Sequence, residues 1–224
     1  RQMCIRDRVS VSEVVKNHNL RFIVDAMSSF GAVDVNVAEL GIDFLISSAN
    51  KCIQGVPGFS FIIARREALT ATEGNARTIS LDLHSQWKTM EKDNGKWRFT
   101  SPTHVVAAFA QALKELQQEG GVTVRGERYA ATNRKLREGM RALGFEPFVS
   151  EAFQGPIITT FLYPEGRNLD FKHMHHWLKE QGYVIYPGKL TDRDTFRIGN
   201  IGEIYDADAD RILELFAQYT KEFM

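Results

Sequence analysis

The chain has 224 residues, a formal net charge of zero and 43% hydrophobic residues. That length suits one or two domains with a substantial core, and the charge balance argues against nucleic acid or an acidic membrane as a partner. No apolar run approaches the roughly 20 residues of a membrane span, and no signal-peptide pattern is present. Two cysteines, Cys4 and Cys52, form no disulfide framework, so we expect a reducing, cytoplasmic compartment.

The first half of the chain alternates short helices with short apolar strands. Residues 1–8 follow neither a helical nor a strand period, and we interpret them as a non-native leader. Beyond them, helices are predicted over residues 11–19 and 35–40, and buried strands over residues 21–26, 44–47 and 58–64. This alternation predicts an α/β fold whose mainly parallel sheet is covered on both faces.

The second half begins with helices. Ser101 and Pro102 form a helix start, with an N-cap and a proline in the first turn. Apolar residues at helical spacing continue to a glycine pair at Gly120, and a second helix runs to Gly144. From Phe145 onward the pattern predicts a small α+β domain, with strands at residues 157–162, 183–186 and 195–198 and helices at residues 171–179 and 207–219. We therefore expect one domain over residues 9–144 and another over residues 145–224.

An acid and an amine stand at the ends of two neighbouring predicted strands. Asp25 follows Phe22-Ile23-Val24, and Lys51 follows the strand that begins at Phe44. Open α/β sheets bind ligands at the carboxyl ends of their strands, so both side chains are candidates for one site. A lysine that forms a Schiff base and an acid that holds a pyridinium nitrogen together suit pyridoxal phosphate. Taken alone, a lysine after a strand is more often a solvated surface residue.

The segment that ends at Lys51 resembles the signature of class V aminotransferases. It reads Ile-Asp-Phe-Leu-x-x-Ser-Ala-x-Lys, and a Gly-x-Ser-x-Ile element follows at Gly58. Asn50 departs from the signature, in which His, Gln or Arg usually precedes the lysine. Within the class, this segment is similar to the enzymes that act on 2-aminoethylphosphonate and pyruvate, and so are residues 24–31 and 196–202.

The resemblance implies a fold-type-I, pyridoxal-phosphate-dependent transaminase that works as a homodimer. It implies that Lys51 carries the cofactor and moves protons, and that Asp25 holds the ring nitrogen. Thr100 and Asn50 would contact the cofactor phosphate, Thr100 from across the dimer interface. Arg197 would hold the substrate anion, because its planar guanidinium suits carboxylate or phosphonate oxygens. The competing interpretation of Arg197 is an edge-strand arginine that reaches to water.

The implied reaction moves the amino group of 2-aminoethylphosphonate to pyruvate and gives phosphonoacetaldehyde and alanine, a step of phosphonate catabolism. The alternatives are another class V transaminase, such as the alanine–glyoxylate type, and a non-catalytic fragment. Members of the class carry a longer N-terminal stretch with a phosphate-binding loop and an aromatic ring over the cofactor. By this resemblance we expect the chain to be the later part of such an enzyme and to be inactive alone.

A metal site is not expected. His173 and His176 share one face of a predicted helix, but no third ligand follows at metal spacing, so a solvated helix face is the better interpretation. Cys52, next to the candidate lysine, is expected to be a packed small residue.

Overall fold

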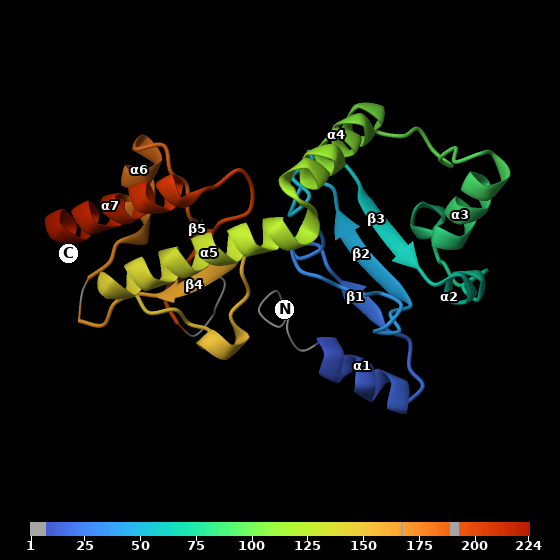
Figure 1. Cartoon of the computed structure of the whole chain (residues 1–224), viewed down its shortest axis with the longest axis horizontal. Helices are drawn as coiled ribbons and strands as arrows, with labels where there is room; N and C mark the ends of the chain where they lie inside the picture. Colours follow the sequence, from blue (N-terminus) through green and yellow to red (C-terminus); the bar gives the residue numbers. More distant parts are fainter. Residues whose placement is uncertain (1–7, 167, 189–192) are drawn as a thin grey trace. The chain divides into compact units, whose positions relative to one another are not determined.

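The computed structural model describes residues 8–166, 168–188 and 193–224, and they form two compact units (Figure 1). The N-terminal unit comprises residues 8–30 and 34–118. The C-terminal unit comprises residues 31–33 and the described residues from 119 to 224. Each unit has its own sheet and its own hydrophobic core.

The N-terminal unit is built on a sheet of order β1-β2-β3, formed by β1 (Ile23–Asp25), β2 (Phe44–Ser48) and β3 (Ser60–Ala64). β1 and β2 are parallel, with Val24 opposite Leu45, and alternate residues of β2 are buried. The core of this unit consists of apolar residues in and beside these strands: Phe22, Val24, Ala26, Ile42 and Leu45. The three strands lie where the sequence predicted them, and the α/β class is confirmed.

β3 runs antiparallel to β2, which differs from the expected mainly parallel sheet. Residues 49–59 connect the two strands through turns, bends and irregular backbone, without a helix. A parallel return needs a crossover of about a dozen residues or more, usually with a helix. The short connection therefore brings the chain back antiparallel, and β1–β2 is the parallel pair among the described residues.

Four α-helices accompany this sheet in the described residues: α1 (Arg8–Asn17), α2 (Arg66–Thr70), α3 (Leu83–Lys92) and α4 (Thr103–Glu119). α1 and α4 match predicted helices. α1 begins at Arg8, whose Nη2 donates a hydrogen bond to Oγ of Ser29 at 2.6 Å, so this last residue of the expected leader belongs to the unit. α4 packs beside β3 through the rings of Phe61 and Phe109, whose centroids lie 5.5 Å apart (Figure 1).

The helix predicted over residues 35–40 is wrong, because residues 35–36 are irregular and residues 37–40 form hydrogen-bonded turns. The side-chain oxygen of Asn36 accepts a bond from the amide of Glu39 at 3.2 Å, and the carbonyl of Asn36 accepts from Leu40 at 3.1 Å. These bonds place Asn36 as a cap at the start of a turn, and only four residues separate it from Gly41, so no more than one turn forms. Gly41, at φ +65°, then leads the chain into β2.

The C-terminal unit carries an antiparallel sheet of order β4-β6-β5, formed by β4 (Ile158–Leu162), β6 (Thr195–Gly199) and β5 (Tyr186–Pro187). Its helices are α5 (Gly121–Ala142), α6 (Phe171–Glu180) and α7 (Asp206–Phe223). Phe196 of β6 lies at the centre of the core, with Phe145, Phe161 and Phe216 between 5.6 and 5.9 Å from its ring. The predicted α+β arrangement agrees with these elements.

The long helix α5 belongs to the C-terminal unit. Leu136 and Met140 of α5 are buried in the core of that unit. α5 also packs closely on α7, because a Cβ added at Gly139 would lie 2.5 Å from Cδ1 of Leu213. The compact unit therefore includes the chain from Glu119 onward, whereas the sequence pattern grouped α5 with the preceding domain.

Candidate active site

Asp25 ends β1, and its surroundings are fixed by β2. The amide of Ala26 donates to the carbonyl of Ile46 at 2.8 Å, and Oγ of Ser47 donates to the carbonyl of Ala26 at 3.3 Å. Oδ1 of Asp25 accepts a bond from the amide of Met27 at 2.9 Å. One carboxylate oxygen thus holds the turn after β1, and Oδ2 has no hydrogen-bond partner among the residues that the structure describes.

Lys51 lies in a tight turn just beyond the carboxyl end of β2, and its side chain is exposed. The carbonyl of Lys51 accepts from the amide of Gln54 at 2.8 Å, and the carbonyl of Ala49 accepts from Gly55 at the same distance. Only glycine fits at position 55, since a Cβ would lie 2.7 Å from that carbonyl oxygen. The turn that presents Lys51 is therefore specified by the sequence that follows it.

The two turns that carry Asp25 and Lys51 are joined to each other. Cys52 is fully buried, as expected for a packed residue, and its Sγ donates to the carbonyl of Ser28 at 3.3 Å. Because β1 and β2 are parallel neighbours, both turns lie at the same edge of the sheet. The structure therefore brings the predicted acid and amine to one edge of the sheet, without a direct hydrogen bond between them in the described residues.

Asn50 and Thr100 both lie in segments that meet at Phe59. Asn50 is half-buried and directly precedes Lys51, and the carbonyl of Phe59 accepts a bond from the amide of Ala49 at 3.4 Å. The ring of Phe59 lies 5.9 Å from Trp97, in the segment that leads to Thr100, and 5.2 Å from Phe109 of α4. Thr100 itself is exposed, three residues before α4. Phe59 thus packs the Lys51 turn against the segment that carries Thr100.

Arg197 belongs to the C-terminal unit and lies on the central strand of its sheet, not on an edge strand as the competing interpretation required. Its side chain is half-buried, on the opposite side of the strand from the buried Phe196 and Ile198. Nε donates to the carbonyl of Pro187 at 3.0 Å, and the guanidinium carbon lies 5.9 Å from the ring of Tyr186. No described residue bonds its two terminal nitrogens, which suits a guanidinium that receives an anion.

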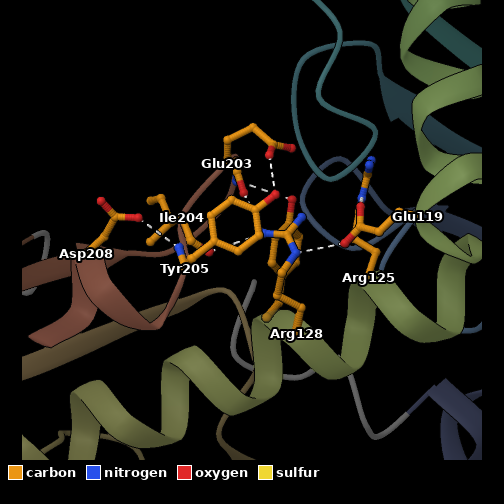
Figure 2. A network of polar contacts seen from close by, with 9 residues as sticks. Glu119, Arg125, Arg128, Glu203, Ile204, Tyr205 and Asp208 are labelled. Carbon is orange, nitrogen blue, oxygen red and sulfur yellow. Dashed lines mark hydrogen bonds and ion pairs between the residues drawn. The ribbon is translucent and has the colours of Figure 1, made fainter.

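A second arginine, Arg128 of α5, binds the loop that follows β6 (Figure 2). Its Nη1 donates to the carbonyls of Gly202 and Ile204 at 2.9 and 3.2 Å, and its Nε donates to Glu119 at 2.7 Å. Its guanidinium carbon also lies 4.8 Å from the ring of Tyr205. This cluster comprises Arg128, Glu119, Tyr205 and the carbonyls of Gly202 and Ile204. It was not predicted, because an arginine within a helix carries no local sequence signal for the loop that it binds.

Glu119 is the acidic centre of that cluster and bonds two arginines (Figure 2). Nε of Arg125, which is 1% exposed, donates to the second carboxylate oxygen of Glu119 at 2.7 Å. Burial raises the pKa of Glu119, but the hydrogen bonds and positive charges of Arg128 and Arg125 outweigh it, so its pKa lies below the ordinary value of 4.5. Glu119 is therefore held ionised in the folded chain.

The two histidines considered for metal binding have other partners. Nδ1 of His173 lies 2.8 Å from the hydroxyl of Tyr219, and Nε2 of His176 lies 3.1 Å from Glu180. In the described part of the chain, no group of three or more His, Cys, Asp or Glu side chains could hold a metal ion. The described helices also include none that is both long and apolar enough to cross a membrane.

Comparisons with known proteins identify similar chains. Residues 4–192 match the family described as Aminotransferase class-V. The chain is 60% identical over 205 residues to a 2-aminoethylphosphonate–pyruvate transaminase of Bacteroides fragilis, covering 92% of this chain and 56% of that protein. It is 56% identical over 214 residues to the protein of the same name in Klebsiella pneumoniae, covering 95% of this chain and 58% of that one. The chain thus spans rather more than half the length of these curated relatives.

Solved structures show the same fold at lower sequence identity. An aspartate aminotransferase from Thermus thermophilus superimposes with a TM-score of 0.84 at 21% identity, over 97% of this chain and 61% of that one. An alanine–glyoxylate aminotransferase from Nostoc superimposes with a TM-score of 0.80 at 21% identity, over 93% of this chain and 56% of that one. These structures show the fold, and the match over residues 4–192 shows that the chain belongs to the class V aminotransferase family.

Proposed function

We propose that the chain serves the transfer of an amino group from 2-aminoethylphosphonate to pyruvate, which yields phosphonoacetaldehyde and alanine. The observation that carries the chemistry is the placement of Asp25 and Lys51 at the carboxyl ends of two adjacent parallel strands. The choice of substrates rests on relatives at 55–60% identity that carry the name of this transaminase. Because the chain spans 56–58% of the length of these relatives, the activity is proposed for the whole catalytic assembly.

The residues at the sheet edge fit pyridoxal phosphate as the cofactor. Lys51 offers an exposed amine, and Asp25 offers a carboxylate oxygen that the turn does not use. We assign Lys51 to hold the cofactor covalently, Asp25 to hold its ring nitrogen in the protonated form, and Asn50 and Thr100 to contact its phosphate. The bound cofactor supplies a ring that accepts the electrons released from the carbon bearing the amino group.

The chain's own residues then handle the proton and the substrate anion. Once the incoming amino group has displaced it from the cofactor, the free amine of Lys51 would take the proton from the carbon that bears the amino group. It would return a proton at the other end of the reacting system, as a general base and acid. Arg197 holds the phosphonate of the donor or the carboxylate of the acceptor through its two terminal nitrogens. Its bond to the carbonyl of Pro187 orients the guanidinium before the anion arrives.

A chimaera tests the proposal. The 205 matched residues of the Bacteroides fragilis relative are replaced by those of this chain, and alanine formation is measured with 2-aminoethylphosphonate and pyruvate. We expect turnover with this pair and little with alanine and glyoxylate. The reverse preference would favour the alanine–glyoxylate alternative. A folded chimaera that binds pyridoxal phosphate but transfers no amino group would contradict the proposed function.

We further propose that the assembly is a homodimer in a reducing, cytoplasmic compartment. Three exposed apolar side chains, Ile79, Leu81 and Phe99, lie in segments joined by Arg98, which donates to the carbonyls of Ile79 and Asp82. Phe99 directly precedes Thr100, so pairing of this surface would place Thr100 at an interface. The buried thiol of Cys52 is compatible with a reducing compartment.

The dimer proposal is tested with two charged substitutions in the chimaera. Leu81 and Leu20 are both exposed leucines of the N-terminal unit, at 82% and 62% exposure. We expect Leu81→Glu to shift the sedimentation profile toward the monomer and Leu20→Glu to leave it unchanged. A monomeric parent, or a dimer that tolerates Leu81→Glu, would contradict this assignment of the interface.

A further inference from the structure

A fully buried amide lies at the exit of β6, three residues after Arg197. Asn200 is 0% exposed, and its Nδ2 donates to the carbonyls of Tyr129 and Pro156 at 2.9 and 3.0 Å. Its Oδ1 accepts from Nδ2 of Asn133 at 3.0 Å, and its backbone amide donates to Ile157 at 3.0 Å. Both amide protons and the side-chain oxygen therefore have partners, on α5 and on the segment that enters β4.

The network continues through α5 to the surface. Asn133, 2% exposed, also donates to Oγ1 of Thr159 on β4 at 3.0 Å, and its Oδ1 accepts from Nε of Arg137 at 2.9 Å. Arg137 in turn forms an ion pair with Glu151, and this bond and one from Arg141 lower the pKa of Glu151. A chain of polar contacts thus runs from an exposed carboxylate to the exit of the strand that carries Arg197.

Apolar packing alone leaves one ambiguity in the position of Arg197. Side chains alternate between the two faces of a strand, so a one-residue slip of β6 would expose Phe196 and Ile198 and is excluded by burial. A two-residue slip keeps the same alternation, yet it would move Arg197 by roughly 6.6 Å along the sheet. The hydrogen bonds of a buried amide can distinguish these registers, because a slipped strand would leave the amide unsatisfied in the core.

We infer that Asn200 and Asn133 are positioning residues for Arg197, fixing the register of β6 so that its guanidinium stands where the substrate anion binds. The segment beyond Asn200 is held as well, since the amide of Gly202 donates to the hydroxyl of Tyr129 at 3.1 Å and Arg128 binds the carbonyls of Gly202 and Ile204. The inference rests on the proposed role of Arg197 as the anion-binding residue. It adds two buried asparagines to the determinants of substrate affinity.

The first test measures the placement of Arg197 in the chain itself. The side-chain Nε–H of Arg197 donates to Pro187, so its NMR signal and its exchange rate with solvent report that contact. We expect Asn200→Ala to speed this exchange by about tenfold or more, as local opening of the β6 exit becomes easier. Gln154→Ala is the matched control, because Gln154 is also a buried amide that donates to two backbone carbonyls, of Gly155 and Ile158. Equal effects of the two substitutions, or no effect of Asn200→Ala, would overturn the inference.

The second test is a double-mutant cycle in the chimaera. We expect Asn200→Ala to raise the KM for 2-aminoethylphosphonate by about tenfold and to change kcat by less than about twofold. In an Arg197→Ala background the same substitution should change KM by less than about twofold, since the residue through which it acts is gone. Additive effects in the two backgrounds would show that Asn200 does not act through Arg197.

A substitute variant and a comparison of results distinguish the failure of the positioning inference from the failure of the proposed role of Arg197. Asn133→Ala leaves both carbonyl bonds of Asn200 intact, and it replaces Asn200→Ala in both tests if that variant does not fold. A KM that is insensitive to Arg197→Ala would overturn the proposed role of Arg197 in function. The exchange rate of the Arg197 Nε–H, measured in the chains that retain Arg197, would still report on positioning. An additive cycle with an Arg197-dependent KM overturns the positioning inference alone.

Discussion

Arg197 donates its Nε–H to the carbonyl of Pro187 at 3.0 Å, across the β5–β6 pair. This contact fixes one edge of the guanidinium and leaves the opposite edge, with its two terminal nitrogens, for another partner. A planar group held in this way can bind two oxygens of a carboxylate or phosphonate at once. An ammonium group on a flexible stem offers the same charge without that geometry.

We therefore predict that Arg197→Lys in the chimaera raises the KM for 2-aminoethylphosphonate by roughly 10- to 100-fold, the range for a lost charged hydrogen bond. The absorbance of bound cofactor should stay nearly unchanged, because Arg197 is not assigned to the cofactor. Steady-state kinetics and an absorbance spectrum check the two parts. If even Arg197→Ala retains the parental KM, the anion is bound elsewhere.

The substitution Asp25→Asn separates charge from structure at the end of β1. An asparagine oxygen can still accept the bond from the amide of Met27, so the turn should persist. The carboxylate charge is lost, and we expect turnover to fall by about 10²- to 10³-fold, as for other groups that stabilise charge in an active site. The thermal midpoint should stay within about 4 °C of the parent. Parental turnover in a folded Asp25→Asn chimaera would remove Asp25 from the site.

The Glu119 cluster predicts a pH dependence of stability. The pKa of Glu119 is lowered in the folded chain, so its contribution to stability is fully present above the unfolded value near 4.5 and is lost as pH falls through the lower folded value. We expect the difference in unfolding free energy between the parent and Glu119→Gln to shrink as pH falls from about 5 to about 3. Urea unfolding of the 224-residue chain at several pH values measures it.

Glu127→Gln serves as the control for that experiment, because Glu127 is an exposed carboxyl on the same helix, α5, and no described ion pair engages it. The unfolding free energy of Glu127→Gln should equal that of the parent at every pH. A difference between parent and Glu119→Gln that stays constant across the acid range would mean that the ion pairs with Arg125 and Arg128 do not drive the effect.

Much of the fold could be predicted from local patterns in the sequence. The strands around Val24 and Leu45 have short apolar runs, and the helix that begins at Thr103 has a proline beside its start and apolar residues at helical spacing. α3 was missed, although Asp82 caps it by accepting a bond from the amide of Ser85 at 2.9 Å. The available signal was an aspartate that can act as an N-cap at the start of the helix. The segments around α3 are exposed and show no clear apolar period, so this signal was not recognised.

Contacts distant in sequence decide the features of the structure that local patterns do not predict. The direction of β3 depends on a connection too short for a crossover, and the compact unit that contains α5 depends on contacts with α7 and β4. Asp25 and Lys51 could be paired from the sequence because parallel strands share an edge. Asn133 and Arg128 could not, since their partners lie 67 to 76 residues away at Asn200, Gly202 and Ile204.

The central claim is that Lys51 holds the cofactor and moves the proton. Its most direct measurement is borohydride reduction of the chimaera with bound pyridoxal phosphate, followed by peptide mapping of the modified lysine. Lys88→Ala is a control, because Lys88 is an exposed lysine whose described contact is the ring of Trp87.

We predict a single label on Lys51, no label in Lys51→Ala, and turnover of 2-aminoethylphosphonate in that variant reduced by orders of magnitude, while Lys88→Ala behaves as the parent. A label on any other lysine, or undiminished alanine formation by Lys51→Ala, would contradict the account.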